Sequence, residues 1–442
     1  MHLRSLLVLA LVAPLTTALL PAHAGAQEND LATLRQAARD NRRDGGAQTR
    51  LGLALLRAGH YREAERVLKT AARLHDESIE SLFDVARVAF AQEDYRRSRG
   101  ACRALERKYA GQSLTHVCRA RAFLVWNRSG RAFEELEAAT AAGGDHFEAH
   151  LALGDAYRLR AEVSESEQAY RRAIELNGQR PEPHFGLGLL YANARRNQDA
   201  IRAFRAALQR DSDDPEIQYE LGRMLEGAEA RRLLAAAVAG RPDMAQAQTA
   251  LGELELAAGN AEAAKTAFEA ALQVNARDAS ALAGLGQVAL QAGDHEGAMT
   301  RFNEALEVVP NNPHVVFLIG QLHQAKGETR EAYEQYRRAA AMAPNEPEAL
   351  LAAASLALEQ DRDVLATGFL DSLLRNHANL AAALALYGDA MKARGDRTRA
   401  REYYQRALRG DGPLDRPAVE AKLREVSTQR TRGRRVQNAT RR

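Results

Sequence analysis

Apolar and small residues follow one repeated pattern along most of the chain. In most blocks of about 34 residues, the second half reads Ala-x-x-x-Phe/Tyr/Leu-x-x-Ala, and the first half commonly carries a Leu-Gly pair. No strictly alternating pattern of apolar and polar residues competes with this helical spacing. The chain is therefore expected to be all-α, with two helices in each block.

Two series of small residues keep step with this pattern at intervals of 34 residues, with one interval of 30. Only Gly, Ala or Ser allows two helix backbones to approach closely, so the two series predict a crossing pair of helices in each block. The first series is Gly52, Ala86, Ala120, Gly154, Gly188, Gly222, Gly252, Gly286, Gly320, Ala354 and Gly388. The second is Ala64, Ser98, Ala132, Ser166, Ala200, Ala230, Ala264, Ala298, Ala332, Ala366 and Ala400.

Helix starts and turns fit the same division. Asp214-Pro215, Asn312-Pro313 and Glu346-Pro347 place a proline in the first helical turn, where its missing N–H does no harm. Ala258-Gly259 and Lys326-Gly327 mark turns within a pair. Blocks in register indicate one elongated solenoid, because each repeat contacts only its neighbours.

The blocks resemble the tetratricopeptide repeat family. Residues 147–180 carry Leu153-Gly154, Tyr157, Ser166, Tyr170 and Ala173, and residues 279–312 carry Leu285-Gly286, Ala298, Phe302 and Ala305. This resemblance covers 45–414 and implies a right-handed α-α superhelix of about eleven helix-turn-helix repeats. The repeats begin at Gly45, Ile79, Ser113, Phe147, Pro181, Pro215, Ala245, Ala279, Pro313, Pro347 and Ala381.

The sequence predicts several further divisions. Residues 1–24 are expected to form an export signal cleaved near 24–26, because His2 and Arg4 precede a short apolar run and small residues. Capping helices are predicted at 27–44 and 415–427, around five full repeats (45–214), a shortened repeat (215–244) and five more (245–414). The short repeat is interpreted either as a hinge or as a tolerated deletion.

Charge and cysteines bear on the compartment. The formal net charge is +3, but the tail 428–442 holds six Arg and no acid, so the folded part is mildly acidic. This tail is predicted to be disordered and able to touch an anionic surface. Cys102 and Cys118 lie at equal distances from Ala110, which allows a disulfide in an oxidising compartment; two buried free thiols are the alternative.

The resemblance also suggests where a partner would bind. In this family the first helices line a concave groove, and equivalent places in the first helices form an apolar ladder with Arg residues one turn further along. Such a face would suit a protein or peptide with apolar anchors and some acidic character. The predicted groove residues are Phe83, Arg87, Phe90, Val117, Arg121, Leu151, Phe185, Tyr219 and Arg223. Part of the ladder packing between neighbouring helices is the alternative.

Other chemistry finds little support. His116, His150 and His184 recur every 34 residues, but a helix-packing distance of about 8–10 Å between repeats is too large for one metal site. No phosphate-binding loop or nucleophile motif is present, and no segment remains for a catalytic domain. We therefore expect no enzyme activity, no cofactor, no metal and no nucleic-acid partner, and the sequence leaves the oligomeric state open.

Two functional hypotheses follow. The first is an exported, periplasmic or extracellular scaffold that binds protein or peptide partners in the groove, for example during assembly of a cell-envelope complex. The second is a membrane- or surface-associated spacer, anchored by an uncleaved N-terminus or by the basic tail. An accessory subunit that positions a separate envelope enzyme is a variant of the first.

Overall fold

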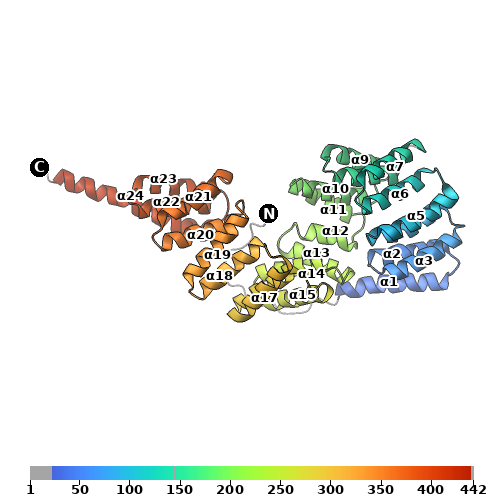
Figure 1. Cartoon of the computed structure of the whole chain (residues 1–442), viewed down its shortest axis with the longest axis horizontal. Coiled ribbons are helices and arrows are strands. Elements are labelled where there is room, and N and C mark those ends of the chain that lie inside the picture. Colours follow the sequence, from blue (N-terminus) through green and yellow to red (C-terminus); the bar gives the residue numbers. More distant parts are fainter. Residues whose placement is uncertain (1–21, 144–145, 440–442) are drawn as a thin grey trace. The chain divides into compact units, whose positions relative to one another are not determined.

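The computed structural model describes residues 22–143 and 146–439, and within them it contains 24 helices and no strand (Figure 1). The all-α prediction is confirmed. The predicted export signal lies almost wholly outside the described residues.

Each repeat supplies two helices. The first helices are α2 (Gly45–Arg57), α4 (Ile79–Ala91), α6 (Ser113–Val125), α8 (Phe147–Leu159), α10 (Glu182–Asn193), α12 (Pro215–Gly222), α14 (Ala245–Ala257), α16 (Ala279–Gln291), α18 (Pro313–Ala325), α20 (Pro347–Glu359) and α22 (Ala381–Ala393). The second helices are α3 (Tyr61–Leu74), α5 (Tyr95–Tyr109), α7 (Ser129–Ala141), α9 (Val163–Leu176), α11 (Asn197–Leu208), α13 (Gly227–Gly240), α15 (Ala261–Val274), α17 (His295–Val308), α19 (Thr329–Met342), α21 (Asp363–Asn376) and α23 (Arg397–Ala407). α1 (Ala22–Asp40) precedes them and α24 (Arg416–Ala439) follows.

Polar side chains cap several first helices. Asp214 accepts hydrogen bonds from the backbone N–H groups of Glu216 and Ile217, and Asn312 does the same for His314 and Val315. These contacts satisfy donors that the first turn of a helix leaves unpaired, so the boundaries read from Asp-Pro and Asn-Pro have a local physical cause.

The small residues of the first helices make room for large rings of the second helices. A Cβ atom added at Gly188 would lie 2.4 Å from the Phe204 ring, and one added at Gly286 would lie 2.4 Å from the Phe302 ring. Both rings are fully buried. The Gly–ring contact is therefore the central packing unit within a repeat, and it explains the 34-residue series of small residues.

The described residues form two compact units, the first ending at Val274 and the second beginning at Asn275. The boundary falls between α15 and α16. The short repeat lies inside the first unit, where α12 has 8 residues while α13 keeps 14. The deletion is therefore confined to the first helix of its pair and the loop after it.

The two end helices differ from the predicted bounds. α1 ends at Asp40, and a turn at 41–43 separates it from α2; Ala38 of α1 packs against Leu51 and Leu55. At the other end, α24 runs from Arg416 to Ala439, past the predicted cap at 415–427, and the disordered tail stays a prediction. Packing of Val419 and Val426 starts this helix, and once a helix has started, each further residue adds a hydrogen bond at little cost.

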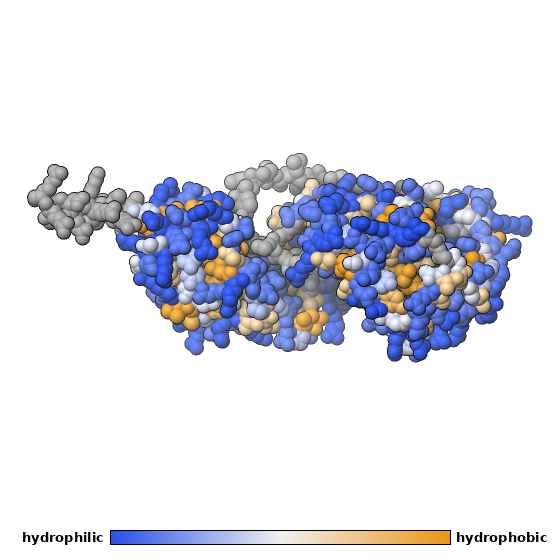
Figure 2. Space-filling model, turned by 90° about the horizontal axis from the view of Figure 1, so that it is seen from above, coloured by the Kyte–Doolittle hydropathy of each residue, from blue (hydrophilic) through white to orange (hydrophobic). Residues whose placement is uncertain are grey.

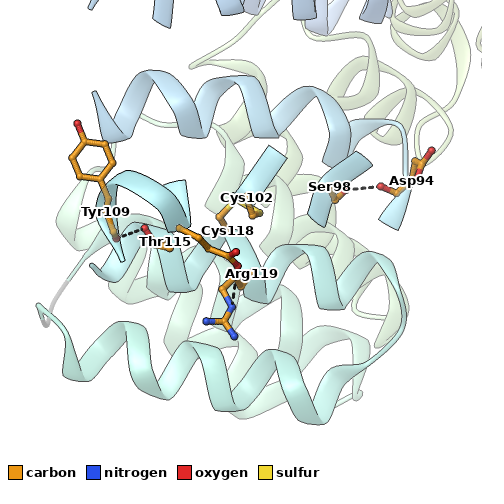
Figure 3. The surroundings of a disulfide bond; sticks show 8 residues. Asp94, Ser98, Cys102, Tyr109, Thr115, Cys118 and Arg119 are labelled. Atoms are coloured by element: carbon orange, nitrogen blue, oxygen red, sulfur yellow. Dashed lines mark hydrogen bonds and ion pairs between the residues drawn. A yellow bond between two sulfur atoms is a disulfide. The ribbon is translucent and has the colours of Figure 1, made fainter. Parts of the chain in front are cut away.

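A disulfide joins two neighbouring repeats. Cys102 of α5 and Cys118 of α6 are bonded, with their Cα atoms 5.7 Å apart and both residues buried (Figure 3). The Thr115 hydroxyl donates a hydrogen bond to the Tyr109 carbonyl at 2.8 Å and ties the turn between these helices. Of the two alternatives for the cysteines, the structure therefore contains the bridge.

Candidate partner-binding face

The first three rungs of the predicted apolar ladder are not available to a ligand. Phe83 is 4% exposed, Val117 is fully buried and Leu151 is 4% exposed. Phe83 and Val117 belong to the core shared by α4–α8. An apolar side chain at this place gains more free energy by packing between adjacent first helices than by facing water, so these three residues are removed from the candidate site.

Other predicted residues keep some exposure. Phe185 and Tyr219 are half-buried, and Phe185 packs on the Phe204 ring at 5.7 Å. Phe90 is half-buried and meets Phe83 edge to face at 6.1 Å. Arg223 is exposed and lies over the Tyr219 ring, 5.9 Å from its centre, while pairing with Glu220 at 2.6 Å.

The remaining two predicted arginines belong to a network that connects α4, α6, α8 and α10. Arg87 Nη2 contacts Glu182 Oε1 at 2.9 Å, although 95 residues separate them. Arg180 Nη2 reaches the same carboxylate at 2.6 Å and Glu148 Oε1 at 3.5 Å. Arg121 lies 3.9 Å from Glu148. We call these five residues the first-helix network.

Burial and charge act in opposite directions on the acids here. Burial by itself would raise the pKa of Glu182, but the hydrogen bonds and charges of Arg180 and Arg87 lower it from 4.5 to about 2. At Asp84, burial prevails over the neighbouring Arg87 and raises the pKa. Glu182 is therefore the anion on which the network depends.

Replacing Glu182 by Gln is expected to destabilise the first unit by about 2 kcal/mol at neutral pH, because two arginines lose their carboxylate; this value allows for partial exposure. The folded-state pKa lies below the unfolded value, so the carboxylate stabilises the fold above pH 4.5, and that contribution disappears as the pH falls towards 2. Thermal unfolding of both proteins across this range tests the prediction.

The matched control is Glu165→Gln on α9, an exposed glutamate. Its unfolding should follow that of the wild-type protein at every pH. A gap between wild type and Glu182→Gln that stayed constant down to pH 2 would contradict the assignment, because it would not come from the ionised carboxylate.

Within the first unit, the two ends of the row of repeats contact each other. Arg57, at the end of α2, pairs with Asp211 at 3.1 Å. Arg241 pairs with Glu216 at 2.9 Å and donates a hydrogen bond to the Arg57 carbonyl at 3.4 Å. α1 packs against α13. Repeats 1 and 6 are therefore in contact, and the first-helix network lies on the repeats between them.

The histidines have structural surroundings. His116 Nδ1 lies 2.9 Å from Glu135, and burial lowers the pKa of both His150 and His184. Within residues 22–143 and 146–439, no group of three or more His, Cys, Asp or Glu is placed to hold a metal ion. In the same residues, no helix is both long and apolar enough to cross a bilayer.

The sequence reasoning missed the acidic half of the network. Glu148 and Glu182 occupy the second place of their repeats, as do Glu80, Glu216 and Glu348. This recurrence is visible in the sequence. The partners of each glutamate are not, because they come from repeats up to three units away.

Comparisons with known proteins agree with this architecture. A family model described as tetratricopeptide repeat matches residues 49–113, 119–181, 185–228, 249–313 and 317–381. Among solved structures, the chain is similar to yeast Tom70, with a TM-score of 0.50 and 12% identity over 88% of this chain and 97% of that one.

Two further structures are more distant. The Cut9–Hcn1 hetero-tetramer of APC/C gives a TM-score of 0.44 and 15% identity over 92% of this chain and 88% of that one. PilW, a type IV pilus biogenesis factor, gives a TM-score of 0.41 and 20% identity over 46% of this chain and 96% of that one. No curated protein sequence matches significantly. The structural similarities concern the fold alone, but the repeat model covers more than half of the residues, and the chain belongs to the tetratricopeptide repeat family.

Proposed function

We propose that this protein is an exported, periplasmic scaffold that holds protein or peptide partners on the first helices of its N-terminal unit and catalyses no reaction. Proteins of this family bind protein partners and are typically non-catalytic scaffolds. The main observation in support of this proposal is the first-helix network. Its Arg87, Arg121 and Arg180 are between one-fifth and one-third exposed and already hold carboxylates, so an incoming carboxylate can replace an internal one.

The surroundings suggest the chemistry of the partner. Arg223 is exposed beside Tyr219, and Phe185 offers a half-buried ring on the neighbouring first helix. Arg and aromatic side chains dominate interface energetics. A segment with one acidic side chain and one or two apolar anchors would meet complementary groups at both α10 and α12.

Two observations support export. The predicted signal at 1–24 has a basic start, a short apolar run and small residues before the cleavage zone. The bridge between Cys102 and Cys118 belongs to an oxidising compartment. We propose the periplasm on this basis.

Site-directed photo-crosslinking in the native cells tests the proposal. A photoreactive residue at Tyr219 or Arg223 is expected to capture a discrete partner, which mass spectrometry of the crosslinked peptides would identify. The same residue at Arg171, on the outward helix α9, is the matched control and should capture far less. Fractionation and the mass of the mature chain would locate the protein and its cleavage site.

The partner-binding face and the periplasmic location can be contradicted separately. Equal capture from Arg171 and Tyr219 would overturn the partner-binding face. A protein that kept residues 1–24 in the membrane fraction would overturn the periplasmic assignment without affecting the binding face.

A further inference from the structure

Two neighbouring second helices carry matching stripes of positive charge. On α3, Arg62, Arg66, Lys69 and Arg73 follow one another at intervals of three or four residues, and all are exposed. On α5, the corresponding stripe is Arg96, Arg99, Arg103 and Arg107, also exposed. Such spacing places each set on one side of its helix. The buried residues Ser98, Cys102 and Leu105 of α5 lie on another side.

The stripes occupy equivalent places in repeats 1 and 2. Arg62 and Arg96, Lys69 and Arg103, and Arg73 and Arg107 are each 34 residues apart. α5 holds six basic residues and one acid, and α3 holds four basic residues and two acids. α23 also holds four basic residues, with one Glu, and the remaining second helices hold at most three basic residues each. Among the second helices α3–α23, α3 and α5 are the one successive pair in which each helix holds four or more basic residues.

Few acids neutralise this surface. Glu65 pairs with Lys69 at 2.5 Å, and Glu63 pairs with Arg35 of α1 at 2.7 Å and lies 3.9 Å from Arg66 of the stripe. Among the described residues, Arg96, Arg103 and Arg107 form no ion pair. Arg66 also lines a depression between α1 and α3, together with Arg35, Arg39 and Arg42. The basic surface thus extends from α5 across α3 to α1.

An exposed aromatic stack adjoins the stripe of α5. The rings of Tyr95 and Trp126 stack with their centres 4.3 Å apart, and Trp126 is 43% exposed. Arg128 lies over the Trp126 ring at 4.7 Å. Arg99, a member of the stripe, donates a hydrogen bond to the Tyr95 hydroxyl at 3.4 Å. The stack and the stripe are therefore continuous.

We propose that the surface formed by the stripes of α3 and α5 and the Tyr95–Trp126 stack docks on an anionic lipid bilayer. Arginine binds phosphate oxygens through its planar guanidinium, and Trp and Tyr with one apolar and one polar side suit the headgroup region. Eight basic residues on two outward helices match an extended anionic surface. A nucleic acid would need the protein in another compartment than the disulfide implies.

This docking surface differs from the partner-binding face. Its basic stripes lie on the second helices α3 and α5, and Trp126 follows the end of α6, whereas the first-helix network consists of other residues on or next to α4, α6, α8 and α10. The two proposals can fail separately, because one concerns lipid and the other a protein segment.

The experiment uses the full chain and vesicles of phosphatidylcholine with or without phosphatidylglycerol. Trp126 is the one tryptophan of the sequence, so its emission reports directly on this surface. We expect a blue shift and co-sedimentation with the anionic vesicles only, both reversed by salt. Arg96→Gln/Arg103→Gln/Arg107→Gln should weaken binding about 100-fold, which corresponds to about 1 kcal/mol for each lost charge.

The matched control is Arg330→Gln/Arg337→Gln/Arg338→Gln, which removes three exposed charges from the second helix α19. It should bind anionic vesicles as the wild-type chain does, and so should a chain lacking 428–442. Loss of binding on removal of 428–442, with no effect of the α5 substitutions, would overturn the proposal. Equal binding to neutral vesicles, or binding to DNA or an acidic protein without binding to the bilayer, would overturn it too.

Discussion

Replacing Gly186 by Val is expected to destabilise the first unit by about 3 kcal/mol, because it places side-chain atoms where a buried ring already lies. The Tyr170 ring lies between Gly154 of its own repeat and Gly186 of the next, and a Cβ atom at either glycine would be 2.5 Å from ring atoms. Overpacking of this kind costs about 1–3 kcal/mol and occasionally more. Chemical unfolding, with hydrogen exchange to locate the loss in α8–α10, measures the effect.

Gly100→Val provides the control within the same unit. Gly100 is an exposed glycine inside α5, and a Cβ atom there would meet nothing within 4 Å. This substitution should be neutral or slightly stabilising, because glycine is a poor helix former. Similar losses at Gly100 and Gly186 would show that helix propensity, rather than the ring, sets the cost.

A substitution of Tyr170 tests whether its ring is what makes a side chain at position 186 unfavourable. Tyr170 fills the space between the two glycines, and its hydroxyl donates a hydrogen bond to Asp155 at 2.7 Å. Tyr170→Ala should cost about 3–5 kcal/mol by leaving a cavity. The double variant with Gly186→Val should lose less than the sum of both, because the valine then enters vacated space.

Removal of the disulfide is expected to lower the free energy of unfolding by about 3 kcal/mol. The bond joins residues 16 apart in sequence, and a loop of this length gives that value in the chain-entropy model. Cys102→Ala/Cys118→Ala should therefore unfold at lower denaturant concentration, with the loss centred on α5 and α6. Denaturant unfolding monitored by circular dichroism makes the measurement.

The reductant response gives the control for this prediction. A reducing agent should destabilise the wild-type chain towards the level of the double variant and leave the double variant unchanged. The Ala substitutions also remove two buried thiols, so their effect should slightly exceed that of reduction. A wild-type chain whose unfolding did not respond to reductant would contradict a stabilising bridge.

Periodicity in the sequence was sufficient to predict the helical pairs. Small residues such as Gly188 and Gly286 recur every 34 residues because each must accept a ring from its partner helix, and this requirement is local to one repeat. Caps such as Asp214 and Asn312 act within a few residues. The end helices were harder to place, because α1 and α24 lack a neighbouring repeat whose pattern would mark their limits.

The binding face depended on contacts that no single repeat contains. Phe83 and Leu151 look like groove residues by position, but both are buried in the structure, because burial of their apolar surface is favourable. Arg87 looks like a free cation in the sequence, yet it meets Glu182, three repeats away.

Interactions within one repeat therefore determine the helical pair, its caps and its small residues, and all of these can be predicted from the printed sequence. The arrangement of successive repeats in the tertiary structure determines which side chains remain accessible. It brought Arg57 to Asp211, joined α4 to α10 through the first-helix network, and left the arginines of α3 and α5 facing outward. The physical reason is that a small rotation between neighbouring repeats accumulates along a solenoid, so distant residues meet at places that depend on the sum of many packing angles.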